Sequence, residues 1–120
     1  MSLEPLTLYK FMTLYMLNKV NFPLTNNQIS SFFLNKEYTT YFIFQQVMSE
    51  LAEASLITAE TVRNTSYYKI TQDGRDTIDM FKNKIPVAII DDMDILKRIT
   101  EFIEYKLNLL FIIYVVFIVS

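Results

Sequence analysis

The residue types that carry most enzyme chemistry are largely missing from this 120-residue chain. It has no cysteine and no histidine, which excludes disulfides, thiolate metal sites, a cysteine nucleophile and the commonest general base. Its single glycine, Gly74, cannot form a phosphate-binding loop of the GxxxxGK[ST] or GxGxxG type. The closest carboxylates are Asp91, Asp92 and Asp94, at a predicted helix start, where acidic residues favour the helix dipole. We therefore predict that the chain is not an enzyme and holds no cofactor and no metal.

Three helices are predicted in the first half of the chain. Leu3–Val20 has apolar residues at spacings of three and four and is apolar nearly all round, so it is buried in its own core or packs against a second copy. Thr25 and Gln28 form a capping box that starts a second helix. A third helix has its N-cap at Thr39 or Thr40. Its predicted core-facing residues are Phe44, Val47, Met48 and Leu51.

A small β-hairpin is predicted next. Ile57–Arg63 alternates, and Tyr67–Ile70 is rich in aromatic and β-branched residues, as strands are. Asn64–Ser66 is the expected connection between the two runs. Thr71 then caps a helix at Gln72–Lys84.

A last helix begins at Pro86 and has an apolar seam. The seam fits a partner helix, or the core-facing side of an ordinary amphipathic helix. Its residues are Ile89, Met93, Leu96, Ile99, Ile103, Leu107 and Leu110.

The eleven residues Leu109–Val119 are all apolar. As a helix they would reach about 16 Å, roughly half of a ~30 Å hydrocarbon core. Extending the run backwards brings in Lys106, Glu104 and Glu101, which are costly inside a bilayer and disfavour a membrane anchor. The alternatives are a buried helix end, a strand against the core or a partner, or a truncated end.

The stretch from Leu51 to Gly74 carries two motifs, one at the end of the third helix and one at the end of the hairpin. Both resemble motifs of winged-helix transcriptional regulators of the MarR/PadR type. In those families an L-x-x-x-G-L-I helix end leads into the wing, and the wing ends in Y-x-(L/I)-T-x-x-G. The residues that match are Leu51, Leu56 and Ile57 in the first motif, and Tyr68, Ile70, Thr71 and Gly74 in the second. Ser55 departs from the first motif, because those families usually have glycine there.

Further stretches, "EPLTLYK", "PLTNNQIS" and "TTYFIFQQVMSEL", resemble a family of bacterial winged-helix proteins known by a domain-of-unknown-function label. The matches cover roughly residues 4–85. The resemblance implies a mainly α fold with a small β-hairpin, in which residues 1–85 form a winged helix-turn-helix domain. Residues 86–120 would be a C-terminal helix with an apolar tail. We expect a homodimer through Leu3–Val20 and Val87–Leu110.

The resemblance also implies a function, which is that of a DNA-binding transcriptional regulator. The third helix would lie in the major groove of double-stranded DNA and the hairpin wing on its backbone. Thr, Ser and Gln side chains can reach bases or phosphates, and a basic wing tip can pair with phosphate. The candidate DNA-binding residues are Lys36, Thr40, Tyr41, Gln45, Gln46, Ser49, Arg63, Asn64, Thr65, Ser66 and Lys69.

The charge of the predicted domain favours DNA binding less strongly than the resemblance does. Residues 1–85 hold eight Lys and Arg and eight Asp and Glu, and the third helix has no cation but carries Glu50 and Glu53. Counterion release would therefore be weak for each protomer. The alternative is a winged-helix module that binds protein and not DNA. No secretory signal opens the chain, and the lack of cysteine fits a reducing compartment, so we expect a cytoplasmic location.

Overall fold

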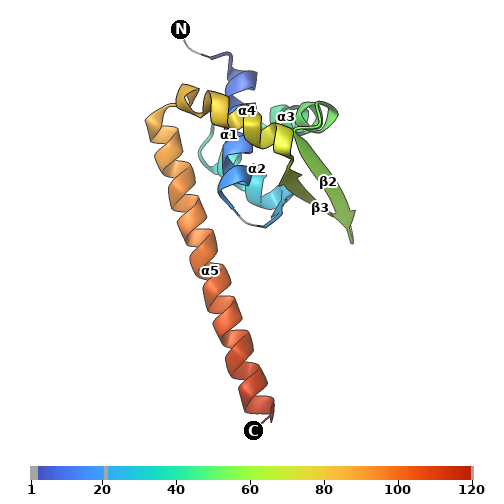
Figure 1. Ribbon diagram of the computed structural model, residues 1–120, viewed down its shortest axis with the longest axis vertical. Helices are drawn as coiled ribbons and strands as arrows, with labels where there is room; N and C mark the ends of the chain where they lie inside the picture. The colour runs from blue at the N-terminus through green and yellow to red at the C-terminus, as the bar shows by residue number, and fades with distance from the viewer. Residues whose placement is uncertain (1–2, 21, 120) are drawn as a thin grey trace. The chain divides into compact units, whose positions relative to one another are not determined.

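The structure is a computed structural model that describes residues 3–20 and 22–119, apart from the side chains at positions 96 and 100. The chain forms two compact units, Met1–Pro86 and Val87–Ser120, which are described separately. The elements of the first unit are α1 (Pro5–Lys19), β1 (Leu24–Thr25), α2 (Asn26–Asn35), α3 (Tyr41–Glu53), β2 (Ile57–Val62), β3 (Thr65–Ile70), α4 (Gln72–Phe81) and the 3₁₀ turn η1 (Lys82–Lys84) (Figure 1). The second unit is one helix, α5 (Val87–Val119). The predicted mainly α fold with a small hairpin is confirmed, and its element order is compatible with a winged helix.

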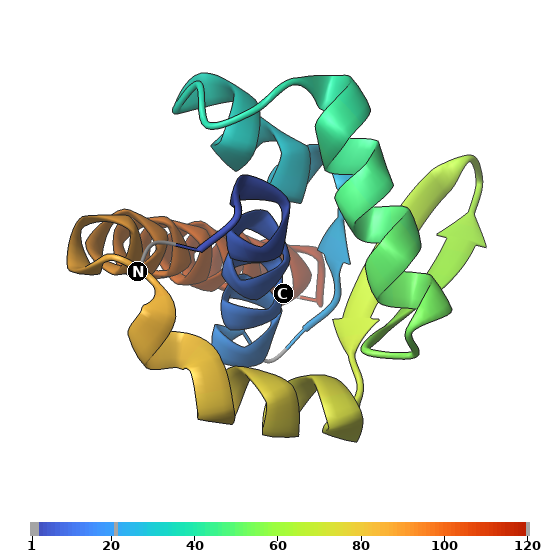
Figure 2. The same cartoon turned by 90° about the horizontal axis from the view of Figure 1, so that it is seen from above.

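The helix α1 lies at the centre of the first unit, in contact with α3, α4 and β3 (Figure 2). Six consecutive residues, Met12–Leu17, are buried, so every side of this part of the helix faces protein. That burial explains why its sequence is apolar nearly all round. The hydroxyl of Thr13, buried among them, donates to the Tyr9 carbonyl at 3.0 Å. Of the two expectations for this helix, burial in its own core describes it, and its use in a dimer stays a prediction.

The predicted capping signals of α2 and α3 are confirmed. The Thr25 hydroxyl accepts from the Gln28 backbone N–H at 3.1 Å, and the Gln28 side chain accepts from the Thr25 N–H at 2.8 Å, which is a complete capping box. Thr40, not Thr39, caps α3. The predicted core residues of α3 are buried, and the rings of Phe33 and Phe44, 5.6 Å apart, pack the two helices together.

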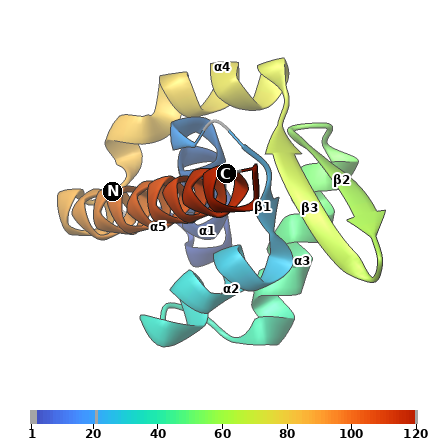
Figure 3. The same cartoon turned by 90° about the horizontal axis from the view of Figure 1, so that it is seen from below.

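The sheet has three antiparallel strands in the order β1-β3-β2 (Figure 3). The two-residue strand β1, in which Leu24 pairs with Tyr68, is absent from the sequence-based expectation. The hairpin turn also differs from that expectation. Val62 pairs with Thr65, so the turn is Arg63-Asn64 and Thr65 and Ser66 belong to β3. Both turn residues have positive φ, 50° and 66°, the geometry of a type I′ turn, whose twist matches that of the strands.

The helix α3 ends in a Schellman motif although it has no glycine there. The Leu56 N–H donates to the Leu51 carbonyl and the Ser55 N–H to the Ala52 carbonyl, both at 3.0 Å. Ser55 has a φ of 60°, the left-handed conformation that glycine usually supplies. The serine at this helix end therefore adopts a backbone conformation that glycine also permits.

The single glycine of the chain lies in the first turn of α4, beside the end of α3. A Cβ atom on Gly74 would be 2.2 Å from the Leu56 carbonyl oxygen and 2.7 Å from a side-chain carbon of Ile70. The Thr71 N–H donates to the same Leu56 carbonyl at 3.1 Å, which holds that oxygen in place. Only glycine permits this close approach of α4 to the base of the hairpin.

The helix α5 continues through Leu109–Val119, so the alternative of a strand for this segment is wrong. Within residues 3–20 and 22–119, α5 is the one helix long and apolar enough to cross a membrane by length and composition. Its most apolar part has a mean hydropathy of 2.0 and is not buried. The side chain of Leu96, one residue of the predicted seam, lies outside the described part of the chain.

Replacing Gly74 with alanine is expected to destabilise the protein by about 1–3 kcal/mol, because the added methyl group overlaps a backbone carbonyl that is held by a hydrogen bond. Urea denaturation of the full chain measures the free energy of unfolding. Met80→Ala, on the exposed side of the same helix, is the control and should change that free energy by less than about 0.5 kcal/mol. A Gly74→Ala variant as stable as this control would contradict the close approach.

Replacing Ser55 with glycine is expected to stabilise the protein by about 0.5–1 kcal/mol, because glycine adopts a positive φ without the steric cost of a Cβ atom. The neighbouring Ala54 has a φ of −79°, so Ala54→Gly should instead destabilise by up to about 1 kcal/mol. Thermal unfolding of the two variants shows whether each one gains or loses stability relative to the unaltered chain. A loss of stability in both would show that the helix end is not strained by serine.

Candidate nucleic-acid interface

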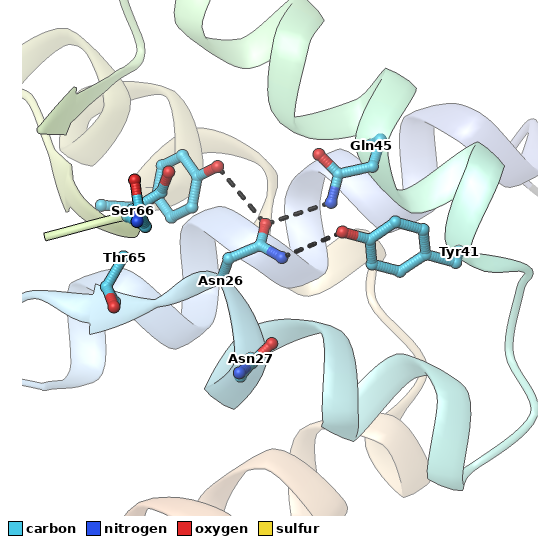
Figure 4. Close-up of a pocket in the computed structure, with 8 residues that line it drawn as sticks. Asn26, Asn27, Tyr41, Gln45, Thr65 and Ser66 are labelled. Carbon is cyan, nitrogen blue, oxygen red and sulfur yellow. Dashed lines mark hydrogen bonds between the residues drawn. The ribbon is translucent and has the colours of Figure 1, made fainter. Parts of the chain in front are cut away.

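A polar groove of about 340 Å³ lies where α2, α3 and the hairpin meet (Figure 4). The start of α2, the first turns of α3 and the tip of the hairpin each contribute side chains to its wall. Among the residues that the structure describes, no charged one lines the groove, and its groups are amides and hydroxyls, which can both donate and accept hydrogen bonds. The lining residues are Asn26, Asn27, Tyr41, Gln45, Asn64, Thr65, Ser66 and Tyr68.

Asn26 joins the three walls of this groove. Its Oδ1 accepts from Gln45 Nε2 at 3.1 Å and from the Tyr68 hydroxyl at 3.4 Å. Its Nδ2 donates to the Tyr41 hydroxyl at 3.4 Å (Figure 4). Asn26 is the first residue of α2 and follows the N-cap Thr25, so the capping box also sets the position of this side chain.

The Tyr68 hydroxyl is a donor that does not ionise readily. Burial raises the pKa of Tyr68, against a smaller lowering by a hydrogen bond with Ser66, and the negative charge of an ionised Tyr41 would raise it further. A protonated phenol can donate to Asn26, whereas a phenolate cannot. Alternation along β3 points Tyr68 to the groove and its neighbours Tyr67 and Lys69 to the other face.

Five of the predicted site residues lie together in this groove and six do not. The five come from the first turns of α3 and from the hairpin tip: Tyr41, Gln45, Asn64, Thr65 and Ser66. The six outside its lining are Lys36, Thr40, Gln46, Ser49, Arg63 and Lys69.

Local contacts explain why three of these six residues lie outside the groove. Thr40 uses its hydroxyl oxygen to accept from the Ile43 N–H at the cap of α3. Gln46 lies one helical position beyond Gln45, so it points toward the start of α1 and hydrogen-bonds Glu50. Lys69 lies in another hollow, which it shares with Arg75 and with Leu17 of α1.

Three lining residues were missing from the sequence-based set: Asn26, Asn27 and Tyr68. The capping box signals where α2 starts, and hence that the next two residues lie at a helix N-terminus. Tyr68 belongs to the wing motif, but its hydroxyl contact with Asn26 joins residues 42 positions apart. Pairing of β1 with β3 brings these two side chains together, and that pairing was not predicted.

The negative charge of α3 is partly neutralised by α1. Lys10 Nζ lies 2.9 Å from Glu50 Oε1, and this hydrogen bond, with one from Gln46, lowers the pKa of Glu50. Glu50 therefore stays ionised beside a fixed cation. Any polyanion that approaches α3 meets an ion pair at this position and not a bare carboxylate.

Replacing Lys10 with methionine is expected to reduce stability at neutral pH and to leave it unchanged in strong acid. The lowered pKa of Glu50 contributes stability above its ordinary value of 4.5, and this contribution is lost as the pH falls through the lowered value. Urea denaturation over a series of pH values measures the difference from the unaltered chain. Lys84→Met removes the same charge from an exposed position and should show no such acid dependence. A constant difference at every pH would contradict the assignment.

Comparison with known proteins identifies a family but no function. No curated protein and no solved structure matches the chain. A family described as "Domain of unknown function (DUF4364)" matches residues 9–114, which include the groove and most of α5. The chain therefore belongs to the DUF4364 family.

Proposed function

We propose that the protein is a DNA-binding transcriptional regulator of the winged helix-turn-helix class that acts as a cytoplasmic dimer. In this proposal α3 enters the major groove and the hairpin contacts the backbone as a wing. The observation that carries the proposal is the groove in which the start of α2, the start of α3 and the hairpin tip present amides and hydroxyls together. Side chains of this kind hydrogen-bond base edges and phosphates.

The shape of the hairpin supports this use. Five of the six residues of β2 are exposed, so the strand projects from the core (Figure 3). Its turn holds Arg63 and Asn64, one cation and one amide. A projecting tip with few apolar side chains can follow a sugar–phosphate backbone without burying hydrophobic surface.

The charge distribution predicts that α3 would contribute more to selectivity among DNA sequences than to affinity for DNA. Its residues include no lysine or arginine, and the first unit has as many acidic as basic residues. Two protomers on one duplex would double the number of wing cations and recognition helices, which is why dimerisation belongs to the proposal. The apolar seam of α5 is the proposed contact between protomers.

Duplex DNA from upstream of the protein's own gene gives the direct test, through fluorescence anisotropy at several salt concentrations. We expect binding that weakens with salt, and loss of about tenfold or more in affinity in the Gln45→Ala/Arg63→Ala double variant. Arg63→Ala alone should reduce the salt slope by about 1 for each wing in contact.

The matched control is Gln72→Ala/Lys82→Ala, which likewise removes one glutamine and one cation, here from α4 and η1. Its affinity should stay within about threefold of the unaltered chain. If no duplex binds at low salt, or if the two double variants behave alike, the proposal is wrong.

One observation favours a second candidate, a winged-helix module that binds protein. Phe42 is 80% exposed and Tyr41 52% exposed in the first turn of α3, and exposed aromatic side chains are typical anchors of protein interfaces. Phe42→Ser would weaken a protein complex strongly. If DNA binding fails while Phe42→Ser abolishes a protein complex, the second candidate replaces the first.

A further inference from the structure

The amide of Gln45 is held in one orientation by Asn26. One N–H of Gln45 Nε2 donates to Asn26 Oδ1 at 3.1 Å (Figure 4). Rotating the Gln45 amide by half a turn would set its Oε1 against Asn26 Oδ1, so that two acceptors would face each other without a proton. The Tyr68 hydroxyl also donates to Asn26 Oδ1, and Asn26 Nδ2 donates to Tyr41. These contacts hold the Asn26 side chain between the hairpin and α3.

The orientation determines which hydrogen-bonding groups Gln45 has left. Its Oε1 can still accept, and its second N–H can still donate. In the major groove adenine presents one acceptor, N7, and one donor, the N6 amino group, whereas guanine presents two acceptors, N7 and O6. One acceptor and one donor side by side match adenine through two hydrogen bonds and cannot satisfy guanine in the same way.

We propose that Asn26 is a positioning residue that orients Gln45 to read an adenine in the major groove. The proposal rests on the proposed DNA-binding function and adds to it the base that is read and the residue that sets the choice. Asn26 need not touch the DNA for this role. Its effect is transmitted through the Gln45 amide.

Two substitutions separate orientation from packing. Asn26→Leu is close in size but offers no acceptor, so Gln45 is free to rotate. Asn26→Asp offers only acceptors, so Gln45 must still donate to it and keep its Oε1 outward. The aspartate adds a negative charge, which lowers affinity for every duplex alike and leaves base preference intact.

The experiment selects duplexes from a randomised pool with the unaltered 120-residue chain, then measures affinity for the selected duplex and for single-base variants of it. For the unaltered chain we expect one adenine per half-site whose replacement by guanine costs about tenfold or more. Gln45→Ala should abolish that preference. Asn26→Leu should reduce it to about threefold or less, and Asn26→Asp should retain it with a uniformly lower affinity.

The hydrogen bond itself has a measurement that does not need DNA. The side-chain amide protons of Gln45 should exchange with solvent more slowly in the unaltered chain and in Asn26→Asp than in Asn26→Leu, as followed by NMR. Thermal unfolding of all variants identifies any that fails to fold, and Asn26→Asp and Gln45→Ala then still test the inference.

The outcomes separate the two proposals. If DNA binds and Asn26→Leu keeps the adenine preference, or Asn26→Asp loses it, the positioning role is wrong and the DNA-binding function stands. If DNA binds with no adenine that depends on Gln45, the inference is likewise overturned. If no duplex binds under any condition, both proposals fail.

Discussion

The arrangement of the first unit depends on one junction. At this junction α3 ends, both strands of the hairpin have their base, and α4 begins. The Leu56 carbonyl accepts the Thr71 N–H, and the Thr71 hydroxyl donates to the Ser55 carbonyl at 2.8 Å. Thr71 thus ties the end of β3 to the end of α3 while it caps α4. The absence of a side chain on Gly74 lets α4 come this close. Because both ends of the hairpin are tied here, its direction relative to α3 is set, and with it the width of the polar groove.

Much of this fold could be predicted because its signals are local. The capping box at Thr25, the cap at Thr71 and the apolar face of α3 depend on residues three or four positions apart, and each is found in the structure. The Schellman motif at Ser55 was harder to predict, because no sequence pattern indicates that a serine will have a positive φ. The hairpin turn was misplaced for the same reason, because Arg63 is an unusual residue for a left-handed position.

The candidate site was predicted less well because its geometry depends on contacts between distant segments. Gln45 meets Asn26 across 19 positions, and Tyr68 meets it across 42. Gln45 and Gln46 were both predicted as candidate DNA-binding residues, but their directions from α3 differ by one helical step. That step sends Gln45 to the groove and Gln46 to Glu50. The residue types of the site could be predicted from the sequence. Which of these residues contact one another depends on the pairing of β1 with β3.

The C-terminal part of α5 is apolar on all sides, and this limits which surroundings can cover it. From Leu107 to Val119 the only polar side chain before the aromatic Tyr114 is Asn108, and exposed apolar side chains follow one another round the helix. A single neighbouring helix covers a stripe of about 100°. Roughly four such neighbours are needed to close the full circumference. A two-helix contact through the seam would therefore leave most of this segment uncovered, and full cover requires an enclosing environment, either several packed helices or hydrocarbon.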